Sequence, residues 1–244
     1  MSVSWAPVRS AMRRHEAALG PLKIWWRDDD AIEATPALER LIRLSEHHLP
    51  VHLAIIPGLV KPSIVDAADA ATVVPVVHGW RHENHQKTGK KSEYGFVRPE
   101  TDTELRQGVE RLSAMFGSRL FPMFVPPWNR VDASVLPLVA DAGHTVLSTF
   151  GDQHLGNTNS LKVVNTHIDP IDWRGSRDLV DPEVLIKAIA NSIADRIQND
   201  GSGEPIGLLT HHLVHSGAIW QFTDALLAEL LNCGAVPWEG SVTT

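Results

Sequence analysis

The chain has 244 residues, of which 43% are hydrophobic and 21% charged, with a formal net charge of −7 and one cysteine. This composition is that of a globular protein, and it excludes an internal disulfide and a strongly basic nucleic-acid-binding protein. No run approaches the roughly 18 apolar residues of a membrane span, and residues 1–20 lack the apolar core of a signal peptide. We therefore expect a cytoplasmic protein without a membrane or nucleic-acid partner, with residues 1–244 in a single domain.

Apolar runs rich in β-forming residues predict seven strands, at 23–26, 51–56, 73–78, 123–127, 145–149, 161–168 and 206–212. Helix-start signals lie between them: Thr35-Pro36, the capping-box pair Thr101 and Glu104, and Asp181-Pro182. Near-continuous apolar strands that alternate with helices indicate a parallel sheet covered on both faces. Seven such strands in one chain favour an α/β barrel over an open sheet.

Polar residues collect where the predicted strands end. In a barrel of parallel strands this is the face that carries the active site. Two long irregular segments are expected to form loops over the same face. The polar residues are Asp28–Asp30, His78, Pro126–Trp128 and His211, and the loops are 79–100 and 150–160.

The aspartate triplet and the paired histidines point to a bound cation. Three adjacent carboxylates at the end of an apolar strand repel one another unless a cation or a shared proton compensates them. His78 and His82 are spaced so that both imidazoles could bind one ion. Taken alone, the triplet could be a solvated acidic turn compensated by Arg27, and the histidines two surface residues. Together, at two strand ends, they favour a catalytic divalent metal site.

In such a site one aspartate would bind the metal and a neighbour would take a proton from the bound water. Neighbouring residues of a strand point to opposite sides, so these two roles require the strand to end or kink here. His211 could protonate a leaving group, or could be a core histidine bonded to the backbone. His212 and His215 lie close by, and one of them could orient its neighbour. His85 could be a further metal ligand, although we favour a role in which it contacts the substrate or one of the metal-binding residues.

The motifs, in their order along the chain, resemble those of the polysaccharide deacetylases, the NodB-homology or carbohydrate esterase family 4 group. The family motif Thr-Phe-Asp-Asp is similar to Trp26-Arg27-Asp28-Asp29-Asp30, and His-Ser/Thr-x-x-His is matched by His78-Gly79-Trp80-Arg81-His82. Arg-x-Pro-aromatic is similar to Val125-Pro126-Pro127-Trp128. The fourth motif is similar to Asp169-Pro-Ile-Asp172-Trp173, and Leu-x-His to Leu209-Thr210-His211. The resemblance spans residues 26–211, and its weight lies in the ordered set.

The resemblance implies a distorted (β/α)7 barrel of the NodB-homology, or glycoside hydrolase–deacetylase, type. It also implies a divalent metal, most often zinc, held by His78, His82 and one aspartate. The triplet allows two alignments, with Asp28 as base and Asp29 as ligand, or with Asp29 as base and Asp30 as ligand. We adopt the second, because relatives of this group often carry a non-aromatic polar residue two places before the acidic pair. Asp28 is then structural.

The activity implied by the resemblance is that of a metal-dependent deacetylase acting on an N- or O-acetyl group of a carbohydrate-type substrate. Asp29 would deprotonate the metal-bound water, and His211 would protonate the leaving group. Trp80, Pro127, Trp128 and Trp173 are the predicted substrate contacts. The expected partner is a small acetylated sugar or precursor. The alternatives are a metal-dependent hydrolase of a small non-sugar amide or ureide, and a non-catalytic carbohydrate-binding relative.

Two departures from the family pattern affect this interpretation. Val125 stands where the family has an arginine that contacts the catalytic aspartate, so Arg27 or Arg130 could take over that role. Asn129 replaces a glycine. Both departures raise the chance of unusual substrate specificity, and of an inactive relative.

Overall fold

The computed structural model describes residues 3–152, 160–198 and 204–238. Its strands are β1 (Lys23–Ala31), β2 (Val51–Ile55), β3 (Val73–His78), β4 (Met123–Val125), β5 (Val146–Leu147), β6 (Lys162–Val163), β7 (Ile206–Thr210) and β8 (Val236–Pro237). Its α-helices are α1 (Ala6–Leu19), α2 (Pro36–His47), α3 (Ser63–Ala67), α4 (Thr101–Phe116), α5 (Leu136–Asp141), α6 (Pro182–Gln198) and α7 (Gly217–Asn232). Short 3-10 turns include Pro127–Asn129 and His212–Val214.

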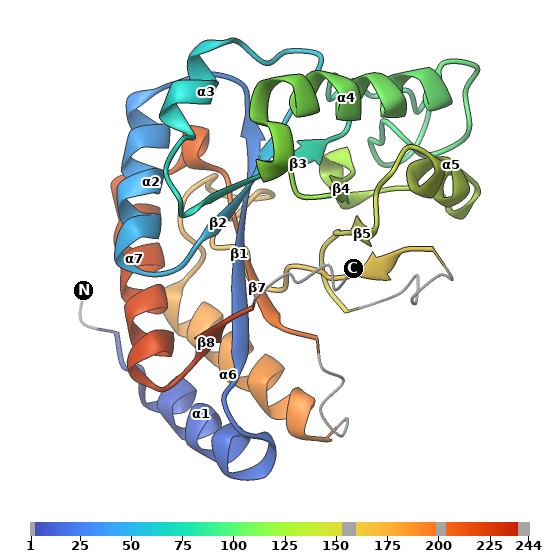
Figure 1. Ribbon diagram of the computed structural model, residues 1–244. Coiled ribbons are helices and arrows are strands. Elements are labelled where there is room, and N and C mark those ends of the chain that lie inside the picture. The colour runs from blue at the N-terminus through green and yellow to red at the C-terminus, as the bar shows by residue number, and fades with distance from the viewer. Residues whose placement is uncertain (1–2, 153–159, 199–203, 239–244) are drawn as a thin grey trace.

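The strands form one parallel sheet in the order β6-β5-β4-β3-β2-β1-β7, with β8 added beside β1 (Figure 1). The stretch that follows β6 reaches β7. The His167 N–H donates to the Gly207 carbonyl at 2.7 Å, and the Leu209 N–H donates to the Ile168 carbonyl at 2.7 Å. These bonds join the two ends of the strand order, so the predicted distorted (β/α)7 barrel is confirmed.

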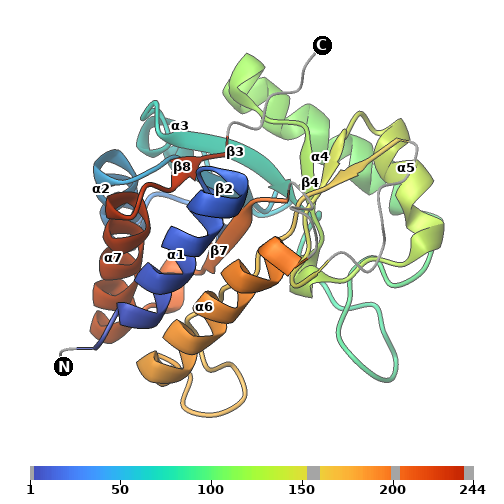
Figure 2. The same cartoon turned by 90° about the horizontal axis from the view of Figure 1, so that it is seen from below.

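Helices cover the outside of the sheet. In both views α2 and α7 lie side by side, and the Arg40 guanidinium of α2 lies 4.9 Å from the Trp220 ring of α7 (Figures 1 and 2). Helix α1 lies beside α7 and packs along α6 (Figure 2). The apolar stripes of these helices and the outer face of the sheet bury one large hydrophobic cluster, which contains Leu38, Trp26 and Ile189.

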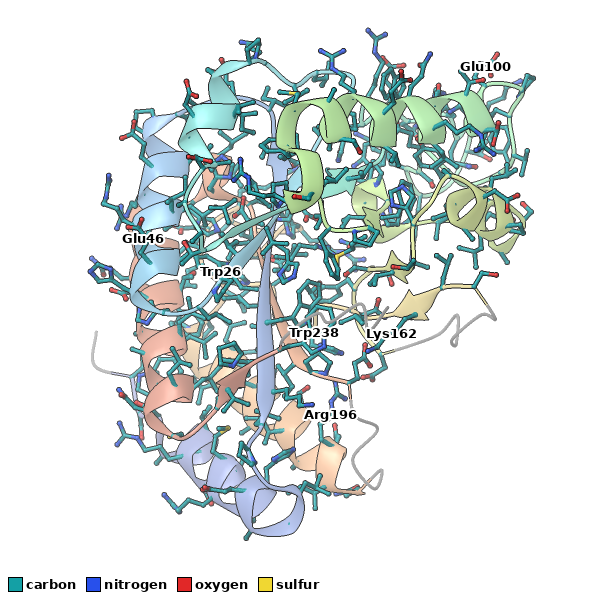
Figure 3. All side chains as sticks on the ribbon, in the orientation of Figure 1. Trp26, Glu46, Glu100, Lys162, Arg196 and Trp238 are labelled. Atoms are coloured by element: carbon teal, nitrogen blue, oxygen red, sulfur yellow. The ribbon has the colours of Figure 1, made fainter. Side chains whose placement is uncertain are left out.

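The side chains on the two faces of β1 pack into different hydrophobic clusters. Trp26 points toward the helices, whereas Glu46 of α2 points away into solvent (Figure 3). Trp25 points to the opposite side, into a smaller cluster inside the barrel where its ring meets that of Trp238 at 5.5 Å. A Cβ at Gly207 would lie 2.4 Å from the Trp25 indole nitrogen, so the strand beside this ring requires glycine. Alternation along β1 therefore also decides where Asp28 and Asp29 point.

Most sequence-predicted elements are found within a few residues of their expected positions. The Thr35 hydroxyl accepts the Leu38 N–H and caps α2 as predicted, and the Asp181 carboxylate accepts the Glu183 N–H at the start of α6. Segment 79–100 is irregular as predicted, while 153–159 of the second predicted loop lies outside the described residues.

The predicted capping box of Thr101 and Glu104 is not found. Helix α4 begins at Thr101 with Glu100 as its N-cap residue, and Thr101 accepts the Arg98 N–H instead. Glu104 pairs with the Arg98 guanidinium and does not reach back to the helix start.

Five of the described helices and strands had not been predicted from the sequence: α1, α3, α5, α7 and the exposed two-residue strand β8. The buried residues of α1, which are Val8, Ala11, Met12 and His15, do have helical spacing. Among the described residues, none of the helices combines the length and apolar character that a membrane crossing requires.

Candidate metal centre and the surrounding cleft

The three aspartates at the end of β1 point in three different directions. Arg27 and Asp29 follow Trp25 on the side that faces the barrel interior, and Asp28 follows Trp26 on the side that faces the helices. Asp30 has a φ of 72°, and the pairing of β1 with β2 shifts register between Asp28 and Ala31. This bulge is the kink that the sequence required, and it frees Asp30 from the strand alternation.

Asp30, His78 and His82 offer ligand atoms that all lie within 4.8 Å of one another. The Asp30 Oδ1 atom is 3.1 Å from His78 Nε2 and 3.3 Å from His82 Nε2. Around a tetrahedral zinc ion with bonds of about 2.0–2.1 Å, neighbouring ligand atoms lie about 3.3–3.4 Å apart. Two imidazole nitrogens and one carboxylate oxygen at these separations fit a divalent ion such as zinc.

The imidazole of His78 is held in the orientation that a metal ligand needs. Its Nδ1 atom donates to the Val125 carbonyl at 3.0 Å, which leaves Nε2 to face Asp30. Burial lowers the pKa of His78, but the carboxylates of Asp29 and Asp30 outweigh this effect and raise the pKa. Burial likewise raises the pKa of Asp30, and the bond and charge of His78 reverse this and hold that pKa below its usual range. Both pKa shifts arise because the His78 imidazole and its neighbouring carboxylates attract each other.

The loop that carries His82 is shaped by a buried glutamate that sequence reasoning missed. Glu93, only 1% exposed, accepts the backbone N–H groups of Trp80 at 3.0 Å, Arg81 at 2.8 Å and Glu83 at 3.3 Å. Gly79 begins this loop with a φ of 55°, and a Cβ there would lie 2.2 Å from Glu93 Oε2. The glycine that replaces the family hydroxyl residue is therefore required by the backbone. An isolated glutamate in a polar loop gave no signal of this role.

Arg27 makes the contact that Val125 cannot make. Its guanidinium binds both oxygens of Asp29, with Nε 2.8 Å from Oδ1 and Nη2 3.1 Å from Oδ2. It also donates to Asn129 Oδ1 at 2.6 Å, Ser148 Oγ at 2.7 Å and the Thr149 carbonyl at 3.2 Å. Arg27 is fully buried, so every one of these bonds offsets the cost of burying its charge. Of the two arginines considered for this role, the structure places Arg27 on Asp29, whereas Arg130 donates to the Lys91 carbonyl.

Asp28 lies behind the cleft and is engaged by different partners. It accepts from the Thr210 hydroxyl at 2.6 Å and from the His212 backbone at 3.0 Å, and its Oδ1 is 2.5 Å from His212 Nδ1. Burial opposes the charged form of both groups. The charge of His212 nevertheless lowers the pKa of Asp28, and that of Asp28 raises the pKa of His212. This arrangement is that of a structural ion pair on the helix side of β1.

His211 faces the candidate metal centre from the end of β7. Trp173 packs edge-on against its ring at 4.8 Å, and the Trp173 indole donates to Asp169 at 2.7 Å. Burial raises the pKa of Asp169 while the charge of His211 opposes that shift. The His211 backbone N–H donates to His215 Nε2 at 3.3 Å, so His215 orients the backbone of its neighbour.

A cleft of about 880 Å³ connects these groups. Asp29, Asp30, His78, His82 and His211 all line it, and so do Trp128 and Trp173 of the predicted substrate contacts. Trp80 packs against the main hydrophobic cluster, Pro127 is buried against Gly79, and neither belongs to the cleft lining, nor does His85. Trp128 lies 4.2 Å from the His82 ring, so it borders the candidate metal site directly.

The structure has the fold of the carbohydrate esterase family 4 deacetylases, as the motifs suggested. Among solved structures, the Bc1960 peptidoglycan N-acetylglucosamine deacetylase superposes with a TM-score of 0.57 at 15% identity, over 89% of this chain and 86% of that one. A family 4 carbohydrate esterase from Streptomyces lividans gives 0.57 at 15% identity, over 92% and 94%. BA3943, a family 4 pseudoenzyme from Bacillus anthracis, gives 0.54 at 12% identity, over 89% of this chain and 63% of that one.

Sequence comparison adds nothing to this likeness: no protein-family model and no curated protein matches the chain.

Proposed function

We propose that the protein is a metal-dependent hydrolase that removes an acetyl group from a carbohydrate-type substrate. The observation that carries this proposal is the convergence of Asp30, His78 and His82 in one cleft, with a second carboxylate, Asp29, beside them. A metal-binding triad next to a separate carboxylate is what hydrolysis by an activated water requires.

Asp29 is the proposed base. It is 2% exposed and lines the cleft, and its link to Arg27 fixes both carboxylate oxygens in place. A carboxylate held this way is ready to accept a proton from the attacking water without reorganising. Arg27 stands two residues before the base on the same strand, whereas the resembled family supplies its arginine from the strand that ends here in Val125.

His211 is the proposed acid. It lines the cleft at the end of β7, and its Nδ1 is buried without a hydrogen-bond partner among the described residues. Trp173 limits the movement of the ring from one side. An imidazole here would protonate the departing amine or alkoxide when the acyl bond breaks.

Asp30, His78 and His82 would hold the ion, for which a ligand set of two imidazoles and one carboxylate favours zinc. The ion would supply a Lewis acid for the acyl carbonyl and lower the pKa of the attacking water. The chain prepares for it in two ways: Val125 fixes the His78 tautomer, and Glu93 fixes the loop of His82. Trp128 and Trp173 offer flat walls on which a sugar ring could stack.

The experiment is a metal analysis combined with an acyl-substrate panel. Protein purified without chelator should contain about one zinc per chain, and should release acetate from acetylated sugars or chitooligosaccharides. His82→Ala should lose metal and activity. His85→Ala, in the same loop but away from the cleft lining, should keep both and is the matched control.

The same panel separates the alternatives. Turnover of cyclic ureides or amides in place of acetylated sugars would assign the protein to the non-sugar hydrolases of this barrel. Absence of bound metal, together with absence of hydrolysis of any acyl substrate, would contradict the enzymatic proposal and leave a carbohydrate-binding protein.

A further inference from the structure

The mouth of the cleft carries a group of cations, Lys90, Lys91, Arg130, Arg174 and Arg177, which we call the cationic rim. They come from three loops that lie far apart in the sequence. In a chain with a net charge of −7, this concentration reverses the sign of the local charge. Such a reversal around a cleft attracts an oppositely charged ligand.

No carboxylate among the described residues neutralises the cationic rim through an ion pair. Elsewhere, arginines and lysines pair with carboxylates, as Arg98 does with Glu104 and Lys61 with Glu33. Among the described residues, no member of the cationic rim makes an ion pair with an aspartate or glutamate. Charges that have no ion-pair partner within this described part of the chain are free to bind one from outside.

The acidic groups of the cleft are already engaged. Asp29 is held by Arg27, and Asp30 lies between two histidines. Asp169 accepts from the Trp173 indole and from a backbone N–H, and burial raises its pKa. None of these carboxylates makes an ion pair with the cationic rim, so an incoming anion would not have to displace one.

The cationic rim also borders both aromatic walls of the cleft. Lys91 Nζ lies 5.9 Å from the ring of Trp128, and the Arg177 guanidinium lies 5.6 Å from the ring of Trp173. The Arg130 guanidinium donates to the Lys91 carbonyl, which ties two members together. A ring stacked on either wall would therefore place a charged substituent next to a cation. At about 880 Å³ the cleft has room for a sugar together with such a substituent.

We propose that the acyl substrate carries a phosphate group, which the cationic rim binds while the acetyl group reaches the candidate metal centre. This inference rests on the proposed function and names the substrate class within it. Phosphate is favoured over a single carboxylate because several donors from separate loops line the same cleft, and guanidinium and ammonium groups together match its multiple oxygens. A neutral polysaccharide would leave this charge unused.

The test compares three substrates that share the N-acetylated sugar ring and differ in the charged group: N-acetylglucosamine 1-phosphate with a phosphate, the methyl glycoside of N-acetylglucosamine with none, and the corresponding N-acetylated uronic acid with a carboxylate. We expect kcat/KM for the phosphate to exceed that for the neutral glycoside about tenfold at low salt, with the difference shrinking as ionic strength rises. Arg174→Gln combined with Arg177→Gln should reduce the preference about fivefold or more through KM. Lys90→Gln combined with Lys91→Gln should do the same, whereas Lys187→Gln on α6 should not.

Binding to the chelator-treated protein gives a second readout that does not depend on turnover. Calorimetry with N-acetylglucosamine 1-phosphate should show binding that both double variants weaken. Equal kcat/KM for the phosphorylated and neutral substrates, or a higher kcat/KM for the uronic acid, would overturn this inference and leave the proposed hydrolase intact. Phosphosugar binding that depends on the cationic rim, without hydrolysis of any substrate, would instead overturn the proposed hydrolase and retain the anion site. Neither binding nor hydrolysis would contradict both.

Discussion

Replacing Arg27 by methionine removes the one ion pair that Asp29 makes among the described residues. The Asp29 side chain is 3% exposed, so its carboxylate would remain buried without a hydrogen-bonded counter-charge, and Asn129 and Ser148 would each lose a donor. Breaking a buried ion pair from one side costs about 3–5 kcal/mol of folding free energy. We expect Arg27→Met to lose that much stability in urea unfolding followed by circular dichroism.

A double-mutant cycle separates the ion pair from simple loss of packing. Adding Asp29→Leu to Arg27→Met removes both charges, so the double variant should recover about 2–3 kcal/mol relative to the sum of the single losses. Arg130→Met is the matched control, because its guanidinium makes an exposed hydrogen bond to a backbone carbonyl; it should cost under about 1 kcal/mol. Additive single losses, or a cost below about 1 kcal/mol for Arg27→Met, would refute the reasoning.

Three further predictions concern the ligand loop, the aspartate triplet and acid stability. Gly79→Ser should weaken zinc binding about tenfold in a competition titration, because the added Cβ meets Glu93. The control is Gly89→Ala, which is also at positive φ but lies in open space and should leave zinc affinity unchanged. Equal zinc affinities in the two variants would contradict this prediction. Asp30→Asn should abolish zinc binding with little loss of stability, and Asp28→Asn should cost about 3 kcal/mol or more while zinc still binds. Zinc binding that is kept in Asp30→Asn and lost in Asp29→Asn would favour the other alignment of the triplet. Burial lowers the pKa of His144 to about 4, so the unfolded chain binds more protons between that value and about 6.5, and stability falls as pH falls. His144→Leu should therefore lose about 2–3 kcal/mol less than wild type between pH 7 and pH 4.5, and parallel pH profiles of unfolding would contradict this.

The sequence located the strands because each is a nearly continuous apolar run, and the clustering of polar residues at strand ends then located the cleft. Period-two alternation could also have placed Arg27 on the same side as Asp29, since they are two residues apart on one strand. The position of Asp30 could not be obtained this way. It depends on a bulge and a left-handed φ at a non-glycine residue, which tertiary contacts impose.

Trp80 is a residue for which the sequence suggested a place in the cleft that the structure does not show. It lies between two candidate metal ligands in the sequence, and a loop tryptophan suggested a wall for substrate. In the structure it packs against the main hydrophobic cluster, while Trp128 and Trp173 line the cleft. Which way a loop residue points depends on the turn conformation, here set by Gly79 and by the carboxylate of Glu93. No local sequence pattern encodes that choice.

The buried carboxylate of Glu93 bears on how the protein would exchange its metal. Because this side chain already holds three backbone N–H groups of the ligand loop, the loop does not need an ion to define its path. Chelation should therefore yield a folded apoprotein that takes up a different divalent ion quickly, unlike small zinc domains whose folding depends on the metal. The metal found in the protein would then reflect the supply of ions around it as much as the chemistry of its ligands.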